Sequence, residues 1–300
     1  MADDRFVLNR RGPDTFSEIE IELSNTLKAT FSGYTLWMQG KSPALQPQVD
    51  MSGNILLWNG DVFHSLVDGE NIPEGLSDTE FLLKKLDKAT TVEEMCNTLE
   101  SIKGPWSLIY YKKILNVIIA GKDRFGRHSL LWNSQNHENG EFPFPLIISS
   151  SSQAGSFCEI PASNLYQISF TNSISVGKVY SRKPYIINRM LLSGNENLPL
   201  SILEDKSSEQ VLNDYLTNWK KEVDELKTIL QESIKLRVQC QPMLCKACVQ
   251  FHLIKQNNKS DQCCAHSKLA ILFSGGLDST VLAALAVFVI ILLCYIIMIY

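Results

Sequence analysis

The sequence lacks an excess of basic residues, and it lacks an apolar run near its beginning. Its 28 Lys and Arg residues are outnumbered by 32 Asp and Glu residues, and the pI is close to 5.8. Because nucleic acid binding relies largely on clustered positive charge, we expect no nucleic acid as a partner. The opening residues MADDRFVLNRRGPD contain no secretory signal, so we expect a cytoplasmic protein.

Cysteine is also absent from the early part of the chain, since no cysteine precedes Cys96. In a reducing compartment, cysteines are free thiols or metal ligands rather than disulfides. Five side chains with a spacing that permits tetrahedral zinc lie close together in the sequence: Cys245, Cys248, Cys263, Cys264 and His266. The irregular sequence of the Cys240–His266 loop favours free thiols instead, and we expect no metal site and no zinc.

Charge is absent from Leu282 to Tyr300. Residues 281–300 are apolar and long enough to cross the hydrocarbon of a bilayer, so membrane contact through a C-terminal transmembrane helix is one interpretation. The other is an aberrant end of a truncated product, because a polar glycine loop directly precedes the run. We expect the aberrant end, with an apolar helix exposed to water.

The composition that is present is that of a globular protein, with 45% hydrophobic and 20% charged residues. Up to about residue 180, short apolar runs bounded by Gly, Pro, Asn or Asp predict a mostly β region. The runs expected to be strands are Leu108–Tyr111, Asn116–Ala120, Ser129–Trp132 and Pro145–Ser149. Thr79–Leu86 and Thr91–Ile102 are expected to be helices, with Asp78 and Thr91 as N-caps.

The second half begins with a polar stretch, residues 186–210, which we expect to be a linker. An amphipathic helix should follow, because apolar residues recur on one face at the helical period. These residues are Leu212, Tyr215, Leu216, Trp219, Val223, Leu226, Leu230 and Ile234. Further on, KLAILF is expected to be a buried strand, SGGLDS a loop and TVLAAL the start of a helix, which is α/β construction.

The SGGLDS loop has the composition of a phosphate site. Gly275 and Gly276 permit a tight turn with converging N–H groups, and Ser279 would open a helix whose positive end favours an anion. Asp278 would repel bare phosphate, so we expect it to hold a cation or orient the loop. The string resembles the pyrophosphate loop of N-type ATP pyrophosphatases. That resemblance implies ATP and Mg²⁺ at Ser274, Gly275, Gly276, Asp278 and Ser279; the alternative is an ordinary turn.

Five earlier pieces occur in a fixed order before this loop: RRGPD, LLWNGDVF, SDTEFLL, GPWSLIYY and KDRFGRHSLLW. Together with SGGLDST they resemble the glutamine-hydrolysing asparagine synthetases, in particular their divergent asparagine synthetase domain-containing branch. The resemblance implies an α+β protein. An N-terminal-nucleophile hydrolase-like αββα sandwich of class II glutaminase type would occupy residues 1–185. After the linker, residues 211–300 would begin an incomplete α/β ATP-pyrophosphatase-like domain, ending in the apolar helix 281–300.

The resemblance also implies a glutamine site. The Asn59 side chain and the Gly60 N–H would form an oxyanion hole, and Asp78 would hold the glutamine α-amine. Glutamine, aspartate and ATP are the small molecules that the family implies. Two simpler interpretations stand beside these: Asn59-Gly60 as a hairpin turn, and Asp78 as a helix cap only. Arg124 and Arg127 are expected to form structural ion pairs.

The chain departs from the family at the residues that do the chemistry. Ala2 follows Met1 where the family has its nucleophilic cysteine, and Cys96 lies in an expected helix. Asp61 replaces the usual glutamate, and Gln39 stands where an arginine would bind the glutamine α-carboxylate. We therefore predict an asparagine synthetase-like protein of glutamine amidotransferase type, placed in asparagine biosynthesis and lacking glutaminase activity. The alternative is a non-catalytic glutaminase-like interaction module, membrane-anchored or not.

Overall fold

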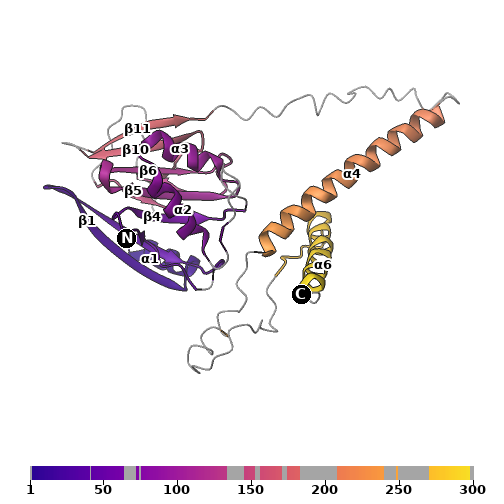
Figure 1. Ribbon diagram of the computed structural model, residues 1–300, viewed down its shortest axis with the longest axis horizontal. Coiled ribbons are helices and arrows are strands. Elements are labelled where there is room, and N and C mark those ends of the chain that lie inside the picture. Colours follow the sequence, from indigo (N-terminus) through magenta and orange to yellow (C-terminus); the bar gives the residue numbers. More distant parts are fainter. Residues whose placement is uncertain are drawn as a thin grey trace. The chain divides into compact units, whose positions relative to one another are not determined.

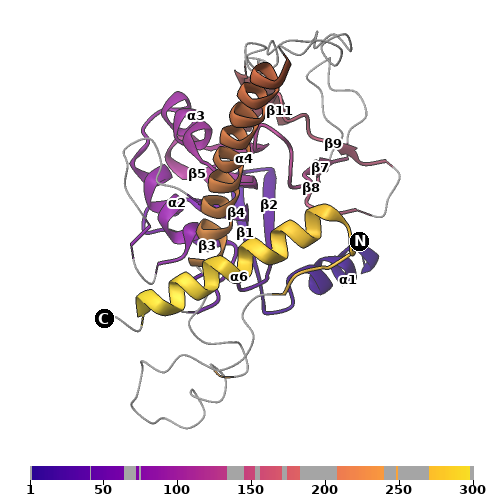
Figure 2. The same cartoon turned by 90° about the vertical axis from the view of Figure 1, so that its right-hand side faces the viewer.

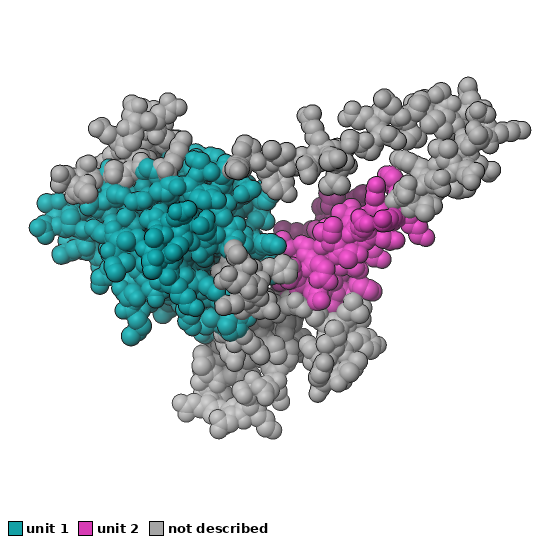
Figure 3. Space-filling model, turned by 45° about the horizontal axis from the view of Figure 1, so that its top comes forward, with its two compact units in different colours: residues 1–183, 241–264 teal, residues 184–240, 265–300 magenta. Residues whose placement is uncertain are grey.

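The computed structural model describes residues 2–40, 42–63, 72–73, 76–133, 145–152, 156–170, 174–182, 208–239, 248 and 270–297. The chain forms two compact units (Figure 3). The first contains residues 1–183 and 241–264, and the second contains residues 184–240 and 265–300.

The first unit is mixed α+β and is built on a six-stranded antiparallel sheet (Figure 1). The strand order is β11-β10-β6-β5-β4-β3. The strands are β3 (Gln48–Val49), β4 (Ile55–Gly60), β5 (Trp106–Lys112), β6 (Val117–Lys122), β10 (Asn164–Phe170) and β11 (Ile174–Ser181). The expected strands at Leu108–Tyr111 and Asn116–Ala120 are confirmed as parts of β5 and β6. A short helical turn, η1 (Lys113–Leu115), connects these two strands.

The sheet is apolar on both faces, because successive side chains of a strand point to opposite sides. On β5, Trp106, Leu108 and Tyr110 belong to one core, whereas Tyr111 belongs to a second core on the other face. Both cores therefore need a covering layer, and each has one.

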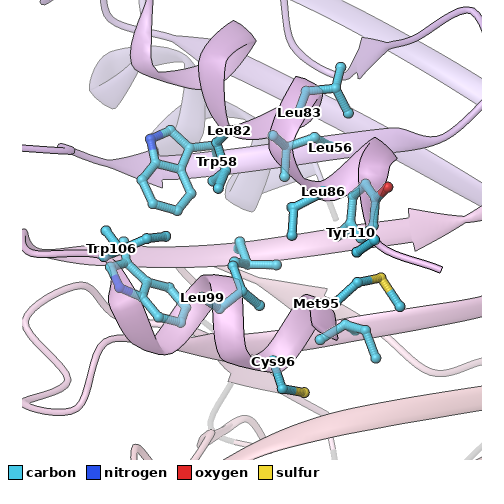
Figure 4. Packing of buried hydrophobic residues seen from close by; sticks show 14 of the residues in the cluster. Leu56, Trp58, Leu82, Leu83, Leu86, Met95, Cys96, Leu99, Trp106 and Tyr110 are labelled. Carbon is cyan, nitrogen blue, oxygen red and sulfur yellow. The ribbon is translucent and has the colours of Figure 1, made fainter. Parts of the chain in front are cut away.

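Helices α2 (Asp78–Lys88) and α3 (Val92–Ser101) cover the first face, and their apolar sides interdigitate with the sheet (Figure 4). Leu82 and Leu86 of α2 and Met95 and Leu99 of α3 are almost fully buried there. Thr91 is the N-cap of α3, as predicted: its side chain accepts the Glu94 N–H at 3.2 Å. Both expected helices are thus confirmed, apart from the cap of α2.

A β-hairpin covers the second face. It consists of β1 (Thr15–Ser24) and β2 (Leu27–Thr35), and its residues Leu23 and Phe31 pack into the second core. Helix α1 (Ala2–Arg11) contacts the hairpin from outside, where Arg5 pairs with Glu18 at 3.2 Å. Figure 2 shows α2 and α3, the sheet, the hairpin and α1 in succession.

Three short strands form a separate sheet in the order β8-β7-β9. They are β7 (Leu131–Trp132), β8 (Ile148–Ser149) and β9 (Cys158–Glu159). Trp132 packs with Tyr166 of β10 in a third core, with ring centroids 5.0 Å apart. The strands expected at Ser129–Trp132 and Pro145–Ser149 are therefore present, but each is only two residues long.

The β3 edge of the large sheet is closed by a side chain. Strand β3 pairs with β4 only at Ile55 and Leu56. Two residues further along β4, the Gln46 side chain donates to the Trp58 carbonyl at 2.8 Å and accepts the Trp58 N–H at 2.7 Å. A single amide thus makes the two hydrogen bonds that a neighbouring strand would make.

The second unit contains helices α4 (Ser208–Gln239) and α6 (Leu277–Ile297), which pack against each other. Helix α4 confirms the expected amphipathic helix and already includes residues 208–210 of the expected linker. The rest of that linker lies outside the described residues. Considering only the part of the chain that the structure describes, no helix combines the length and apolarity needed to cross a membrane.

The prediction of a buried strand at KLAILF is wrong for residues 270–273, the part of this segment that the structure describes. Residues 270–274 form no strand, and Leu272 is 98% exposed. A strand is stable only beside a partner, and no described strand pairs with this segment. The following helix begins at Leu277 rather than at Thr280, so the glycine loop is shorter than expected.

Candidate functional site

Asn59 and Gly60 are the last two residues of β4 and lie opposite Ser107 and Trp106 of β5. The hairpin-turn interpretation is therefore wrong, because the strand that pairs with β4 is β5, and helices α2 and α3 lie between these two strands in the sequence. Gly60 is required by packing, since a Cβ there would lie 2.6 Å from the Pro105 carbonyl oxygen. Most of β4 is buried, but its last two residues, Asn59 and Gly60, are only partly buried.

Asp78 is the first residue of α2, and the N-cap is Ser77 rather than Asp78. Ser77 accepts the Glu80 N–H at 3.2 Å, and the Glu80 carboxylate accepts the Ser77 N–H at 3.1 Å. This capping box was visible in the sequence as Ser77-x-x-Glu80. Because Ser77 caps the helix, the interpretation of Asp78 as a cap is wrong, and its carboxylate is available for other contacts.

The Asp78 carboxylate is held inside the first unit. It is 5% exposed and accepts the Trp58 indole N–H at 3.1 Å and the Thr79 N–H at 2.8 Å. Burial raises its pKa to about 6, the hydrogen bond from Trp58 opposes that rise, and the negative charge of Asp61 adds to it. Asp78 can therefore carry a proton at mildly acidic pH. Trp58 is the partner that reasoning from the sequence missed.

Two of the residues that depart from the pattern of the family that the motifs resemble bond to each other. The Gln39 side chain donates to the Asp61 carboxylate at 3.0 Å. Gln39 is positioned by Trp37. The indole N–H of Trp37 donates to the Gln39 carbonyl at 2.9 Å, and its backbone N–H donates to the Asp14 carboxylate at 2.8 Å. The RGPD element, the Gln39 loop and the end of β4 thus meet. A neutral amide bound to a carboxylate cannot neutralise the α-carboxylate of a ligand.

The thiol of Cys96 is not activated as a nucleophile. Cys96 is buried in α3, and burial raises its pKa to about 11. A thiol with a raised pKa is a poor nucleophile at neutral pH. Cys158 lies on β9, and neither Cys158 nor Cys248 forms a disulfide.

Metal-binding side chains do not gather in the described part of the chain, where no group of three or more is found. Of the five residues with zinc-like spacing, four lie outside the described residues: Cys245, Cys263, Cys264 and His266. The expectation of free thiols in that loop stays a prediction.

Arg124 and Arg127 form ion pairs, as expected, with Glu100 at 3.1 Å and with Asp123 at 3.0 Å. Asp123 is the organising residue of this motif. Burial raises the pKa of Asp123, but hydrogen bonds from the Trp106 N–H and the Arg127 side chain more than offset this and lower it below its usual range. The KDRFGRH motif therefore fixes the end of β6 against the start of β5, next to Gly60.

The phosphate-like loop lies in the second unit, directly before α6. Gly275 has φ +80°, and a Cβ built there would meet nothing within 4 Å, so the loop leaves open space beside its backbone. Ser279 bonds to the Ser274 hydroxyl and to the Gly276 carbonyl, both at 3.1 Å. Asp278 is exposed in the first turn of the helix. This donor set fits a phosphate, and the Asp278 carboxylate fits Mg²⁺.

Comparisons with known proteins agree with the motifs. No family model matches the chain. Asparagine synthetase domain-containing protein 1 of Mus musculus is 29% identical over 333 residues, covering 93% of this chain and 50% of that protein. The Homo sapiens protein of the same name is 26% identical, covering 93% and 49%. Asparagine synthetase domain-containing protein CG17486 of Drosophila melanogaster is 30% identical, covering 94% and 52%.

Two solved structures are weakly similar. Glutamine phosphoribosylpyrophosphate amidotransferase from B. subtilis, complexed with ADP and GMP, gives a TM-score of 0.33 at 16% identity over 45% of this chain and 31% of that one. A structure of the allosteric regulatory enzyme of purine biosynthesis gives 0.39 at 14% identity, over 57% and 44%.

The curated relatives are matched along nearly the whole of this chain, which itself spans about half of their length. The order of motifs and these matches agree: the chain is related to the asparagine synthetase domain-containing proteins.

Proposed function

We propose that the chain is an asparagine synthetase-like protein of glutamine amidotransferase type, acting in asparagine biosynthesis, and that its first unit is a glutaminase-type αββα sandwich that does not hydrolyse glutamine. The observation that carries this proposal is the Gln39–Asp61 hydrogen bond of 3.0 Å. The position that would bind the ligand's carboxylate is neutral and already engaged within the protein.

The remaining residues retain part of a glutaminase pocket. The Asn59 side chain and the Gly60 N–H would stabilise a developing oxyanion, and Asp78 would attract an amine. A reaction also needs a nucleophile, and the described thiol of Cys96 is buried with a raised pKa. Because the Cys96 thiol is not activated and Gln39 supplies no positive charge for the α-carboxylate, we expect these residues to bind glutamine weakly without covalent chemistry.

Ammonia release from glutamine tests this proposal. We expect the purified chain to release no more ammonia than a buffer control, and we expect Asn59→Ala to change nothing. Ammonia release that Asn59→Ala abolishes would show that the oxyanion residues serve a working nucleophile, and the proposal would then be wrong.

For the second unit we propose weak, Mg²⁺-dependent contact with the pyrophosphate of ATP at Ser274, Gly275, Gly276, Asp278 and Ser279. Support comes from the open backbone at Gly275 and from the helix that follows. The loop hydroxyls bond to each other, so a ligand must displace the Ser274–Ser279 contact. Titration calorimetry with MgATP should give a dissociation constant no tighter than about 1 mM, and micromolar binding would contradict this. Aspartate as the acceptor and a cytoplasmic location complete the proposal.

A second candidate function is an interaction module without catalysis. Exposed apolar residues on α4, including Trp219, favour it, because an apolar helix face is a common binding surface.

A further inference from the structure

Helix α4 carries apolar residues at alternating intervals of four and three. They are Leu212, Leu216, Trp219, Val223, Leu226 and Leu230. This is the heptad spacing of a coiled-coil seam, with Leu216, Val223 and Leu230 at a positions and Leu212, Trp219 and Leu226 at d positions. The helix is continuous from Ser208 to Gln239, so all six residues share one stripe.

The middle of this seam is open to water. Trp219 is 57% exposed, Val223 50% and Leu226 56%. Helix α6 packs against α4, but the described side chains of α4 become partly buried only from Leu230 onward. The α4–α6 contact therefore leaves the seam between Trp219 and Leu226 exposed. A row of large apolar side chains in water is unfavourable, and a partner helix would cover it.

The charges beside the seam indicate which partner fits. Glu222 occupies a g position, and Lys220 and Lys227 occupy e positions. In a parallel pair of identical helices, each g residue faces the e residue five positions later on its partner. Glu222 of each helix then lies beside Lys227 of the other, which gives two attractive contacts. An antiparallel pair would place lysine beside lysine and glutamate beside glutamate. The side chains of all three residues are exposed and can reach a partner.

We infer that α4 is a dimerisation helix, and that residues 212–230 form a parallel two-stranded coiled coil with the same segment of a second copy of this chain. Val223 at an a position with leucine at d positions favours two strands. The seam is about 28 Å long and short for a coiled coil, so the dimer is weak and dissociates on dilution. This inference concerns α4 alone and does not depend on the glutamine site or the ATP loop.

The test uses two differently tagged full-length copies, co-expressed and solubilised in a mild non-ionic detergent that suppresses association through α6. One tag is captured, and the co-captured amount of the other copy is measured. Two copies of Glu222→Lys face each other with like charges, as do two copies of Lys227→Glu. We expect each like pair to lower co-capture at least threefold. A Glu222→Lys copy combined with a Lys227→Glu copy restores both attractive contacts and should recover the wild-type value.

Two variants complete the design. Lys221→Glu makes the same change of charge as Lys227→Glu on the outer face of the helix, so co-capture should not change. Leu226→Lys interrupts the seam and should lower co-capture about tenfold while circular dichroism shows an unchanged helix content. Undiminished co-capture of Leu226→Lys, or no co-capture of the wild-type chain, would overturn the dimer. Loss in both like pairs without recovery in the mixed pair would overturn its parallel orientation.

Discussion

Asp78 is a buried acid beside a second carboxylate, and its titration should be visible in the stability of the fold. The pKa of Asp78 is raised from 3.8 to about 6 in the folded chain, chiefly by burial. Between these values the folded state binds more protons than the unfolded state, so stability is full below the lower value and falls as pH rises through the upper one. At pH 7.5 the loss should reach up to roughly 3 kcal/mol.

We therefore expect wild-type protein to be more stable toward urea at pH 5 than at pH 7.5, followed by tryptophan fluorescence. Asp78→Asn removes the titration while keeping an acceptor for Trp58. Only about half of the titration falls between pH 5 and pH 7.5, so the difference in stability between these two pH values should shrink by roughly 1.4 kcal/mol. An equal pH dependence in the variant would mean that other groups cause it.

Cys96 should be unreactive in the folded protein. Its side chain is buried in α3, and burial raises its pKa to about 11, so little thiolate exists and little is accessible. Brief alkylation with iodoacetamide at pH 8 should leave Cys96 unmodified by peptide mass spectrometry, whereas Cys158, which is partly exposed, serves as the internal comparison. Alkylation in urea should modify both equally. Rapid native labelling of Cys96 would contradict its buried position.

At the scale of single elements, α3 depends on its N-cap. Thr91→Ala removes the acceptor for the Glu94 N–H and half of a capping box, which should cost roughly 1 kcal/mol of unfolding free energy. Thr91→Ser keeps the hydroxyl and is the matched control, expected to stay close to wild type in urea unfolding. Equal stability of the alanine and serine variants would show that tertiary packing alone holds this end of the helix.

The elements that were predicted correctly are those specified by nearby residues. Helices α2 and α3 could be predicted because each begins with a hydroxyl residue followed three positions later by glutamate. Asn59-Gly60 has the local signature of a hairpin, yet β4 pairs with β5, which lies more than forty residues further along the chain. Residues 271–273 are as apolar as a buried strand, but strand formation requires a partner that no local pattern reveals.

At the scale of the whole first unit, the candidate site also divides into residues that local motifs predict and contacts between distant residues that they do not predict. Asn59, Gly60 and Asp78 were found from motifs, because motifs record residue type and order. The bonds of Gln39 to Asp61 and of Trp58 to Asp78 join residues 22 and 20 positions apart. Neither bond follows from periodicity or spacing, because both depend on how the loop after β2, the end of β4 and the start of α2 come together.

The whole chain should be poorly soluble in water. On α6, Leu277 is 79% exposed and Val287 and Phe288 are about half exposed, next to the exposed segment at Leu272. We expect the full chain expressed in the cytosol to require detergent, whereas a version ending at Leu200 should be soluble and folded. Alkaline carbonate extraction followed by density flotation provides the check: we expect a dense pellet, and material that floats with lipid would indicate membrane insertion instead.

The Gln46 amide has a consequence for how copies of the protein can meet. The free edge of a sheet is a template on which another chain can grow, and this is how many folded proteins begin to form fibrils. At Trp58 both backbone groups are already saturated by one glutamine side chain. Replacing Gln46 with leucine would uncover that template while leaving the apolar cores untouched, and seeded fibril growth would then start from the sheet itself.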